Sequence, residues 1–263
     1  MASCAPVLGG QEPFSVAPGH LNSEIVGGRA VADGSQFSRQ VALVTVSKTT
    51  KVSETLSEKR IASCSGTFIA RDIVLTAAHC LAAIEFDEIT VQFGVNEKAV
   101  SFSTKVNQYA INTKFSMATG LPDDDLALLR TTTLLPETHT VTLLATQSPA
   151  PLSAAAAVGY GINYYTENRG PTATDSRVLR TAHLHIDQIL LGNPKTFSVV
   201  VDDANGVSHG DSGGPLFILE DEKVKQIGVA SSITSESVGA RANYVDVLGQ
   251  AEWIRQTIET LKK

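Results

Sequence analysis

The chain has 263 residues, a formal charge of -6 at neutral pH and 43% hydrophobic residues, which is the profile of an ordinary globular protein. This length allows one large all-β unit or two small domains. The basic residues are scattered along the sequence, so we expect neither a nucleic-acid partner nor binding to an anionic membrane surface. No stretch has the eighteen or so consecutive apolar residues of a membrane span, and none is predicted.

Residues 1–24 are rich in Gly, Pro and Ser and lack hydrophobic periodicity, so we interpret them as a leader. They also lack the basic start and the apolar run of a secretory signal. Ala2-Ser3-Cys4 resembles the remnant of a lipoprotein cleavage box, which would place a lipid anchor on Cys4. The alternative is a stray thiol in the leader, and both interpretations stay open.

From residue 25 onward, short β-like runs recur between turn residues, for example at 41–46, 89–93 and 197–201. Many short strands punctuated by Gly, Asn and Asp indicate a β-sandwich or barrel. Residues 47–60 are polar and rich in charge, and we expect them to form a surface loop.

Two further segments differ from this β-like pattern. Residues 134–152 contain three prolines and few charges, which suits a connection between two halves of the protein. In the tail, Trp253, Ile254, Ile258 and Leu261 recur at helical spacing, which predicts a C-terminal helix.

Two cysteines, Cys64 and Cys80, flank the β-like run at residues 67–75. No further ligand-like cysteines and no histidine pair at metal spacing accompany them, so a disulfide is favoured over a zinc site, and we predict no metal or cofactor. Closing a loop of about 15 residues would stabilise the fold by about 3 kcal/mol in the chain-entropy model. A disulfide of this kind implies an oxidising, extracytoplasmic location.

The most specific motif is Gly-Asp-Ser-Gly-Gly-Pro at residues 210–215, with Ser212 at its centre. A serine hydroxyl is a poor nucleophile unless a base takes its proton and the site stabilises the resulting oxyanion. Flanking glycines let the backbone turn tightly and leave amide N–H groups bare. A Gly-rich turn without chemistry is the simpler alternative, and the motif needs context.

Three other motifs provide that context. His79 follows the hydrophobic run before Cys80, and Asp125 directly precedes the apolar run at 126–129. The sequence Ile-Val-Gly-Gly at residues 25–28 directly follows the leader. Taken singly, a buried structural histidine or an acidic surface turn would be the default, but the four motifs occur together and in this order.

On these motifs the sequence resembles the chymotrypsin/trypsin family of serine peptidases from residue 25 to residue 263. The resemblance implies an all-β fold of two antiparallel six-stranded β-barrels with a C-terminal α-helix. The expected limits are about 25–140 for the first barrel, about 141–247 for the second and about 248–262 for the helix, after a pro-segment at 1–24.

The resemblance also assigns a catalytic triad in the family's chain order. Ser212 would attack the scissile carbonyl, His79 would take and return the proton, and Asp125 would orient His79. The backbone N–H groups of Gly210 and Ser212 would form the oxyanion hole, and Ser231 would support Asp125. The neighbouring carboxylates at positions 123 and 124 are expected to lie in solvent.

The leader would make the chain an inactive precursor. Cleavage between Glu24 and Ile25 would create an ammonium group on Ile25, which in the family inserts beside the aspartate before the serine, here Asp211. Because Glu24 stands where the family often has Lys or Arg, we expect another protease with acidic preference to act as the activator.

The specificity pocket would be shallow and neutral, as in elastases, because Gly206 stands where trypsin-like members carry an aspartate. The expected substrate-binding residues are Gly206, Val207, His209, Ser231, Ile233 and Ala242. Apolar pockets discriminate weakly, so we predict broad cleavage after small or aliphatic residues. Ser208 replaces a family cysteine, so only one disulfide is expected, as in cysteine-poor bacterial or fungal-like members.

The sequence therefore predicts a secreted or periplasmic, monomeric serine endopeptidase that acts on proteins or peptides. The main alternative is a non-catalytic binding protein on the same fold, because fold alone does not guarantee activity. A serine esterase of another fold would need a Gly-x-Ser-x-Gly elbow before a helix and the chain order Ser, acid, His, and that order is absent from this chain.

Overall fold

A computed structural model describes residues 28–52, 57–82, 85–117, 124–161, 177–190, 196–201, 207–236 and 239–263. Four residues with predicted roles lie outside the described residues, namely Cys4, Glu24, Ile25 and Gly206. Within the described residues no helix is long and apolar enough to cross a membrane.

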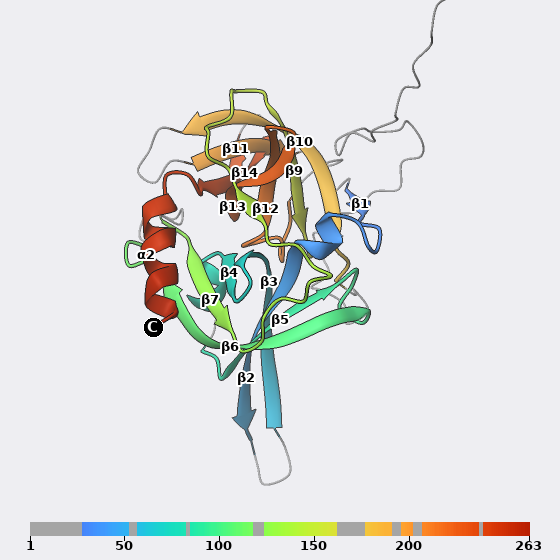
Figure 1. The fold of residues 1–263 in the computed structure, drawn as a ribbon, viewed down its shortest axis with the longest axis vertical. Helices are drawn as coiled ribbons and strands as arrows, with labels where there is room; N and C mark the ends of the chain where they lie inside the picture. Colours follow the sequence, from blue (N-terminus) through green and yellow to red (C-terminus); the bar gives the residue numbers. More distant parts are fainter. Residues whose placement is uncertain are drawn as a thin grey trace, which may run out of the picture.

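The described chain is built almost entirely of strands (Figure 1). In chain order the elements are β1 (Arg29–Ala30), η1 (Phe37–Arg39), β2 (Val41–Lys51), β3 (Ser57–Ala70), β4 (Ile73–Thr76), α1 (His79–Ala82), β5 (Glu88–Gly94), β6 (Val100–Ile111), β7 (Ala127–Thr131), β8 (Leu143–Leu144), β9 (Ala154–Gly159), β10 (Arg180–Leu190), β11 (Thr196–Val201), β12 (Pro215–Glu220), β13 (Lys223–Glu236), β14 (Gly239–Asp246) and α2 (Ala251–Leu261).

Strands β2 to β7 close into the first barrel in the order β2-β3-β4-β7-β6-β5. Alternation of buried and outward side chains creates its inner face, as in β5, where Ile89, Val91 and Phe93 point into the core. Because the barrel is closed, every strand has a hydrogen-bonded neighbour on both sides over its paired length. The exposed edges of an open sheet are removed in this way.

The second barrel closes in the order β9-β10-β11-β14-β13-β12, because β9 pairs with both β10 and β12. The short β1 adds to β10, and β8 pairs with β13 in parallel. The chain thus has two closed six-stranded antiparallel barrels and a C-terminal helix, which confirms the predicted fold. Residues 134–152 connect the two barrels, as expected.

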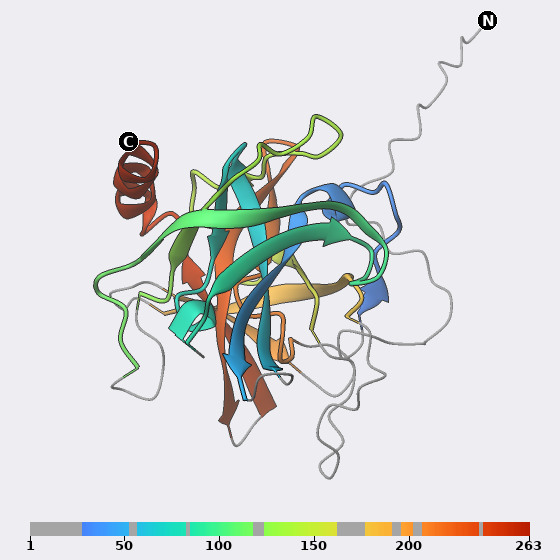
Figure 2. The ribbon, with the colours of Figure 1, turned by 90° about the horizontal axis from the view of Figure 1, so that it is seen from below.

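A separate apolar cluster joins the barrels to each other. Val41 and Leu43 of the first barrel pack with Ala156, Val158 and Phe217 of the second. Helix α2 instead packs on the first barrel, since its Ile254 and Leu261 belong to that barrel's core and the Arg130 guanidinium of β7 donates a hydrogen bond to the Leu261 carbonyl at 2.6 Å. Figure 2 shows α2 on the opposite side of the molecule from β1.

The prediction of a surface loop over residues 47–60 was wrong in its conformation. Strand β2 runs to Lys51 and β3 starts at Ser57, and the two pair in unbroken register from Val41↔Thr67 to Lys51↔Ser57. The described parts of this segment, residues 47–52 and 57–60, therefore lie mostly in two paired strands, which extend beyond the rest of the first barrel (Figure 1). Polar composition marked its exposure, but threonines and alternating side chains also suit strands.

Candidate active site

His79 and Asp125 meet because β4 and β7 are antiparallel neighbours. Thr76 at the end of β4 is paired with Ala127 at the start of β7. His79 follows Thr76 by three positions and Asp125 precedes Ala127 by two, so the two residues come to lie opposite each other. The His79 ring atom Nδ1 lies 2.7 Å from Asp125 Oδ2, and the His79 backbone N–H donates to Asp125 Oδ1 at 2.8 Å. The two bonds fix the ring against a carboxylate with no exposed surface.

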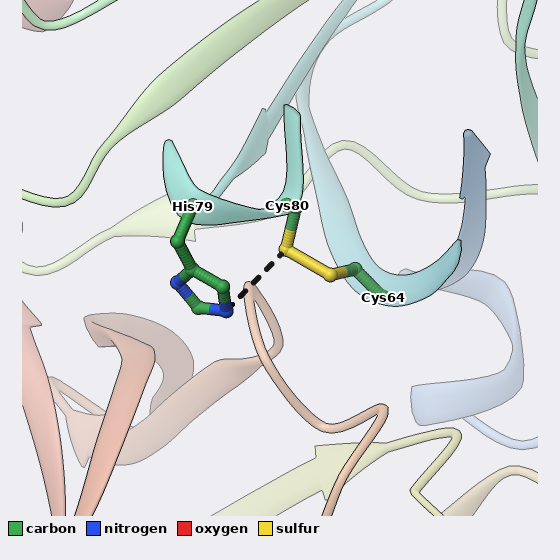
Figure 3. Close-up of side chains that lie close together, drawn as sticks. All are labelled: Cys64, His79 and Cys80. Carbon is green, nitrogen blue, oxygen red and sulfur yellow. Dashed lines mark hydrogen bonds between the residues drawn. A yellow bond between two sulfur atoms is a disulfide. The ribbon is translucent and has the colours of Figure 1, made fainter. Parts of the chain in front are cut away.

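This contact determines which ring nitrogen can react. When Nδ1–H donates to the Asp125 carboxylate, the neutral ring keeps its free lone pair on Nε2. Nε2 faces the disulfide between Cys64 and Cys80, 3.9 Å from Cys80 Sγ (Figure 3). The predicted disulfide is thus confirmed, and it borders the reactive side of the imidazole.

Ser231 lies on the second barrel but reaches the same carboxylate. Its hydroxyl donates to Asp125 Oδ2 at 2.6 Å. Ser231 sits at a β-bulge, where the register of β13 against β14 shifts between Ala230 and Ser232, and bulges often re-aim a side chain in this way. The carboxylate of Asp125 is therefore held from both barrels.

The turn that carries Ser212 is docked onto the first barrel by Ser65. The Ser65 N–H donates to the Ser212 carbonyl at 2.8 Å, and the Ser65 hydroxyl donates to the Gly210 carbonyl at 2.9 Å. Gly213 has φ +77°, and a Cβ there would collide with the backbone of Ser65 and the side chain of Thr76. Glycine is needed at this position because the two barrels approach too closely for a side chain.

Among the described residues, no hydrogen bond joins the Ser212 hydroxyl to His79. Bonds of this kind are often long in the absence of substrate. The backbone N–H groups of Gly210 and Ser212 likewise donate to no acceptor in the described part of the chain. Gly210 has φ +104°, a conformation that other residues rarely adopt. The turn thus offers two unpaired donors next to one serine.

Asp211, the residue before Ser212, is almost fully buried. Its carboxylate accepts hydrogen bonds from the Gly161 and Ser208 N–H groups, both at 2.8 Å. Burial raises the pKa of Asp211 to about 6, while these donors and the field of the Arg177 guanidinium act in the opposite direction. A buried carboxylate of this kind is costly when it is charged.

The residues predicted for the specificity pocket are placed in part. Ile233 and Ala242 are direct cross-strand partners in β13 and β14, with Ala242 buried and Ile233 46% exposed. Val207 is buried and His209 is exposed. Neither Ile233 nor Ala242 carries a charge, so this one cross-strand residue pair contributes no charged group.

Asp124 was predicted to lie in solvent, and that prediction was wrong. It is buried at φ +47°, and its carboxylate accepts a hydrogen bond from the Gln250 side-chain amide at 2.5 Å. Gln250 directly precedes α2, and its side-chain carbonyl accepts from the Asn112 amide at 3.2 Å. The network ties the segment before Asp125 to the residue after β6 and to the residue before α2. Gln250 lies 126 positions from Asp124, so spacing alone did not reveal the contact.

Replacing Gln250 by alanine should destabilise the protein by about 1–3 kcal/mol, because the buried Asp124 carboxylate loses its described side-chain donor. Urea denaturation measures the change. Gln256→Ala is the matched control, since it removes an amide from the exposed face of α2 and should cost less than about 0.5 kcal/mol. Equal effects of the two variants would contradict the role assigned to Gln250.

One cluster of metal-ligand residue types occurs among the described residues, formed by Cys64, His79 and Cys80. Both sulfurs are consumed by the disulfide, and thiolates are what metals bind. This cluster therefore does not fit a metal ion.

Two closed six-stranded antiparallel barrels followed by a C-terminal helix define the trypsin class of fold. The family model described as Trypsin matches residues 25–254, and the chain belongs to this family of serine peptidases. It is 25% identical to trypsin alpha of Drosophila erecta over 271 residues, which covers 97% of this chain and 94% of that protein. It is 24% identical to trypsin delta of Drosophila melanogaster over 269 residues, covering 97% and 96%.

Proposed function

We propose that this protein is a secreted serine endopeptidase made as an inactive precursor, with His79, Asp125 and Ser212 as its catalytic triad. The observation that carries the proposal is the Asp125 carboxylate, which is buried and bonded to both His79 and Ser231. A buried carboxylate that fixes one tautomer of an imidazole next to a serine turn is the arrangement that nucleophilic catalysis requires. The disulfide supports an extracytoplasmic location.

In this mechanism His79 Nε2 takes the proton of the Ser212 hydroxyl as the oxygen attacks the scissile carbonyl. Asp125 stabilises the imidazolium that forms, and the N–H groups of Gly210 and Ser212 bind the oxyanion. His79 then protonates the leaving amine, which departs and leaves an acyl group on Ser212. Water attacks this ester by the same sequence of proton transfers and releases the second product.

Activation follows from the environment of Asp211. In the precursor its carboxylate has neutral N–H donors and a cation, Arg177, that acts through its field. Cleavage between Glu24 and Ile25 would supply an ammonium group, and inserting it beside Asp211 would pair a buried charge that is costly alone. Release of a pro-segment is a known way to bias a two-state site.

The specificity that fits this pocket is for small or aliphatic residues before the scissile bond. Gly206 supplies no carboxylate that could pair with the side chain of Lys or Arg. The bulky side chain of Ile233, opposite Ala242 on the neighbouring strand, narrows the entrance of the pocket. Val207 adds a buried apolar side chain.

A peptide library tests this function directly. We expect the protein, once cleaved before Ile25, to hydrolyse bonds after Ala, Val, Ile or Leu, with differences of about 1–3 kcal/mol per methylene in the apolar pocket. Mass spectrometry of the products gives the cleaved positions. Comparable hydrolysis after Arg and Val would contradict the pocket assignment alone, whereas no hydrolysis of any peptide would favour a non-catalytic binding protein.

A further inference from the structure

Asp125 is the central residue of a tight turn, and both of its chain neighbours are held by hydrogen bonds. The Leu126 N–H donates to the Asp124 carbonyl at 2.8 Å, which closes a three-residue turn around Asp125. Asp124 has φ +47°, a conformation that residues other than glycine adopt uncommonly. The position of the Asp125 carboxylate therefore depends on where the residues before and after it are held.

Asn112 holds both of these neighbours, Leu126 directly and Asp124 through Gln250. The Asn112 backbone N–H donates to the Leu126 carbonyl at 2.9 Å. Its side-chain amide donates to the Gln250 side-chain carbonyl at 3.2 Å, and the Gln250 amide donates to the Asp124 carboxylate at 2.5 Å. The side chains of Asn112, Gln250 and Asp124 are all buried. Hydrogen bonds in such surroundings are stronger than in water, so this series of bonds can hold the turn in place.

The place of Gln250 is set by helix α2. The Gln250 backbone carbonyl accepts from the Ile254 N–H at 2.9 Å, in the first turn of the helix. Ile254 is buried in the core of the first barrel, and α2 contacts β6 and β7 (Figure 1). The last helix of the chain thus carries a donor to the turn that presents Asp125.

The Asp125 carboxylate has little freedom to move without losing its own partners. It accepts from the His79 backbone N–H at 2.8 Å, contacts the His79 ring at 2.7 Å and accepts from the Ser231 hydroxyl at 2.6 Å. The three contacts require one orientation of the carboxylate. A displacement of about 1 Å in an active site can lower a rate by about a hundredfold.

On the basis of the proposed peptidase function, we infer that Gln250 and Asn112 are positioning residues for the catalytic aspartate. They fix the turn at residues 124–126, and this turn holds the Asp125 carboxylate against His79. Helix α2 therefore serves the reaction as well as covering the first barrel. Because the pocket residues of β13 and β14 belong to the second barrel, loss of this positioning lowers kcat and leaves KM nearly unchanged.

The first test compares Gln250→Ala with Ile254→Ala in the cleaved protein. Ile254→Ala removes a buried side chain of α2 from the core, one turn further along, and keeps the Gln250 side chain. We expect Gln250→Ala to lower kcat by roughly ten- to a hundredfold. Ile254→Ala should change kcat by less than about threefold, although it destabilises the fold at least as much. Equal losses of kcat, measured with one peptide at a temperature where both variants are folded, would overturn the positioning role.

An exchange of donor and acceptor provides a rescue. Gln250→Glu places a second carboxylate against Asp124 and should lower kcat at least as far as Gln250→Ala. Adding Asp124→Asn gives this new carboxylate one amide donor from position 124 and one from Asn112, so both bonds can form again. We expect kcat of the double variant to return to within about threefold of Asp124→Asn alone. A double variant as slow as Gln250→Glu would contradict the inference.

Nuclear magnetic resonance tests the same role without a substrate. In the uncut full-length protein, the proton and nitrogen signals of the His79 Nδ1–H group report its contact with Asp125. Gln250→Ala should shift these signals, whereas Ile254→Ala should leave them unchanged. If the unaltered cleaved protein hydrolysed no peptide, the peptidase function would fail. An unchanged His79 signal in Gln250→Ala would by itself overturn the positioning role.

Discussion

Replacing Ser212 by alanine in the cleaved protein should lower kcat for peptide hydrolysis by about a millionfold, with little change in KM. Removing the nucleophile or the base alone has an effect of this size in serine peptidases that carry the same triad on an unrelated fold. His79→Ala should be about as damaging, and the double variant hardly worse, because the two groups act as one unit. Steady-state rates on one good peptide substrate measure all three variants.

A fluorophosphonate probe provides the independent readout. It should label Ser212 of the cleaved protein and fail to label Ser212→Ala, while thermal unfolding shows that both proteins are folded. Ser232 is a suitable control, since its neighbour Ser231 bonds to Asp125 whereas Ser232 itself pairs with Asn243 across β13 and β14. Ser232→Ala should keep both labelling and activity. A Ser212→Ala protein within tenfold of the original rate would rule out the triad.

The second large effect concerns Asp211 and pH. In the uncut protein its pKa is raised to about 6 from an ordinary value of 3.8, so the folded state prefers the protonated form. Asp211 contributes most to the free energy of unfolding below about pH 4. This contribution, about 3 kcal/mol, is lost as the pH rises through about 6. The Asp211→Asn variant should lack this loss. Urea denaturation of both uncut proteins between pH 4 and pH 7 measures the difference.

Cleavage before Ile25 should reverse this preference, so that the folded protein favours the ionised form of Asp211. A free α-amino group ordinarily has a pKa of about 7.7–8.0, so the new ammonium pairs with ionised Asp211 at neutral pH and loses its charge under alkaline conditions. We therefore expect activity to appear on cleavage, to fall at alkaline pH and to be largely absent from cleaved Asp211→Asn. Full activity from a protein that cannot be cut after Glu24 would contradict the activation mechanism.

The short motifs carried more information than the strand pattern. The serine turn, the histidine after an apolar run and the aspartate before one together predicted the fold class and the candidate triad. The cysteine pair predicted the Cys64–Cys80 disulfide, which the structure contains. The motifs could be read from the sequence because each is formed by residues within a few positions of one another, and the two cysteines are only sixteen positions apart.

Two expectations failed where long-range contacts decide the outcome. Asp124 looked like one of three solvent carboxylates, but Gln250, more than a hundred positions away, bonds to it inside the protein. The polar residues at 47–60 looked like a loop, but pairing with one another extends both strands of a hairpin. The polar composition of a segment indicates that its side chains are exposed. Burial of a side chain and pairing of a strand depend instead on partners that only the folded chain brings close.

The sequence by itself determined which residues can do chemistry, since reactive side chains and the glycines around them are local properties. The tertiary structure alone decided where those residues meet: β4 beside β7 places His79 against Asp125, and a bulge in β13 sends Ser231 to the same carboxylate. Register and barrel closure determine these placements, and both arise from many distant contacts that form together.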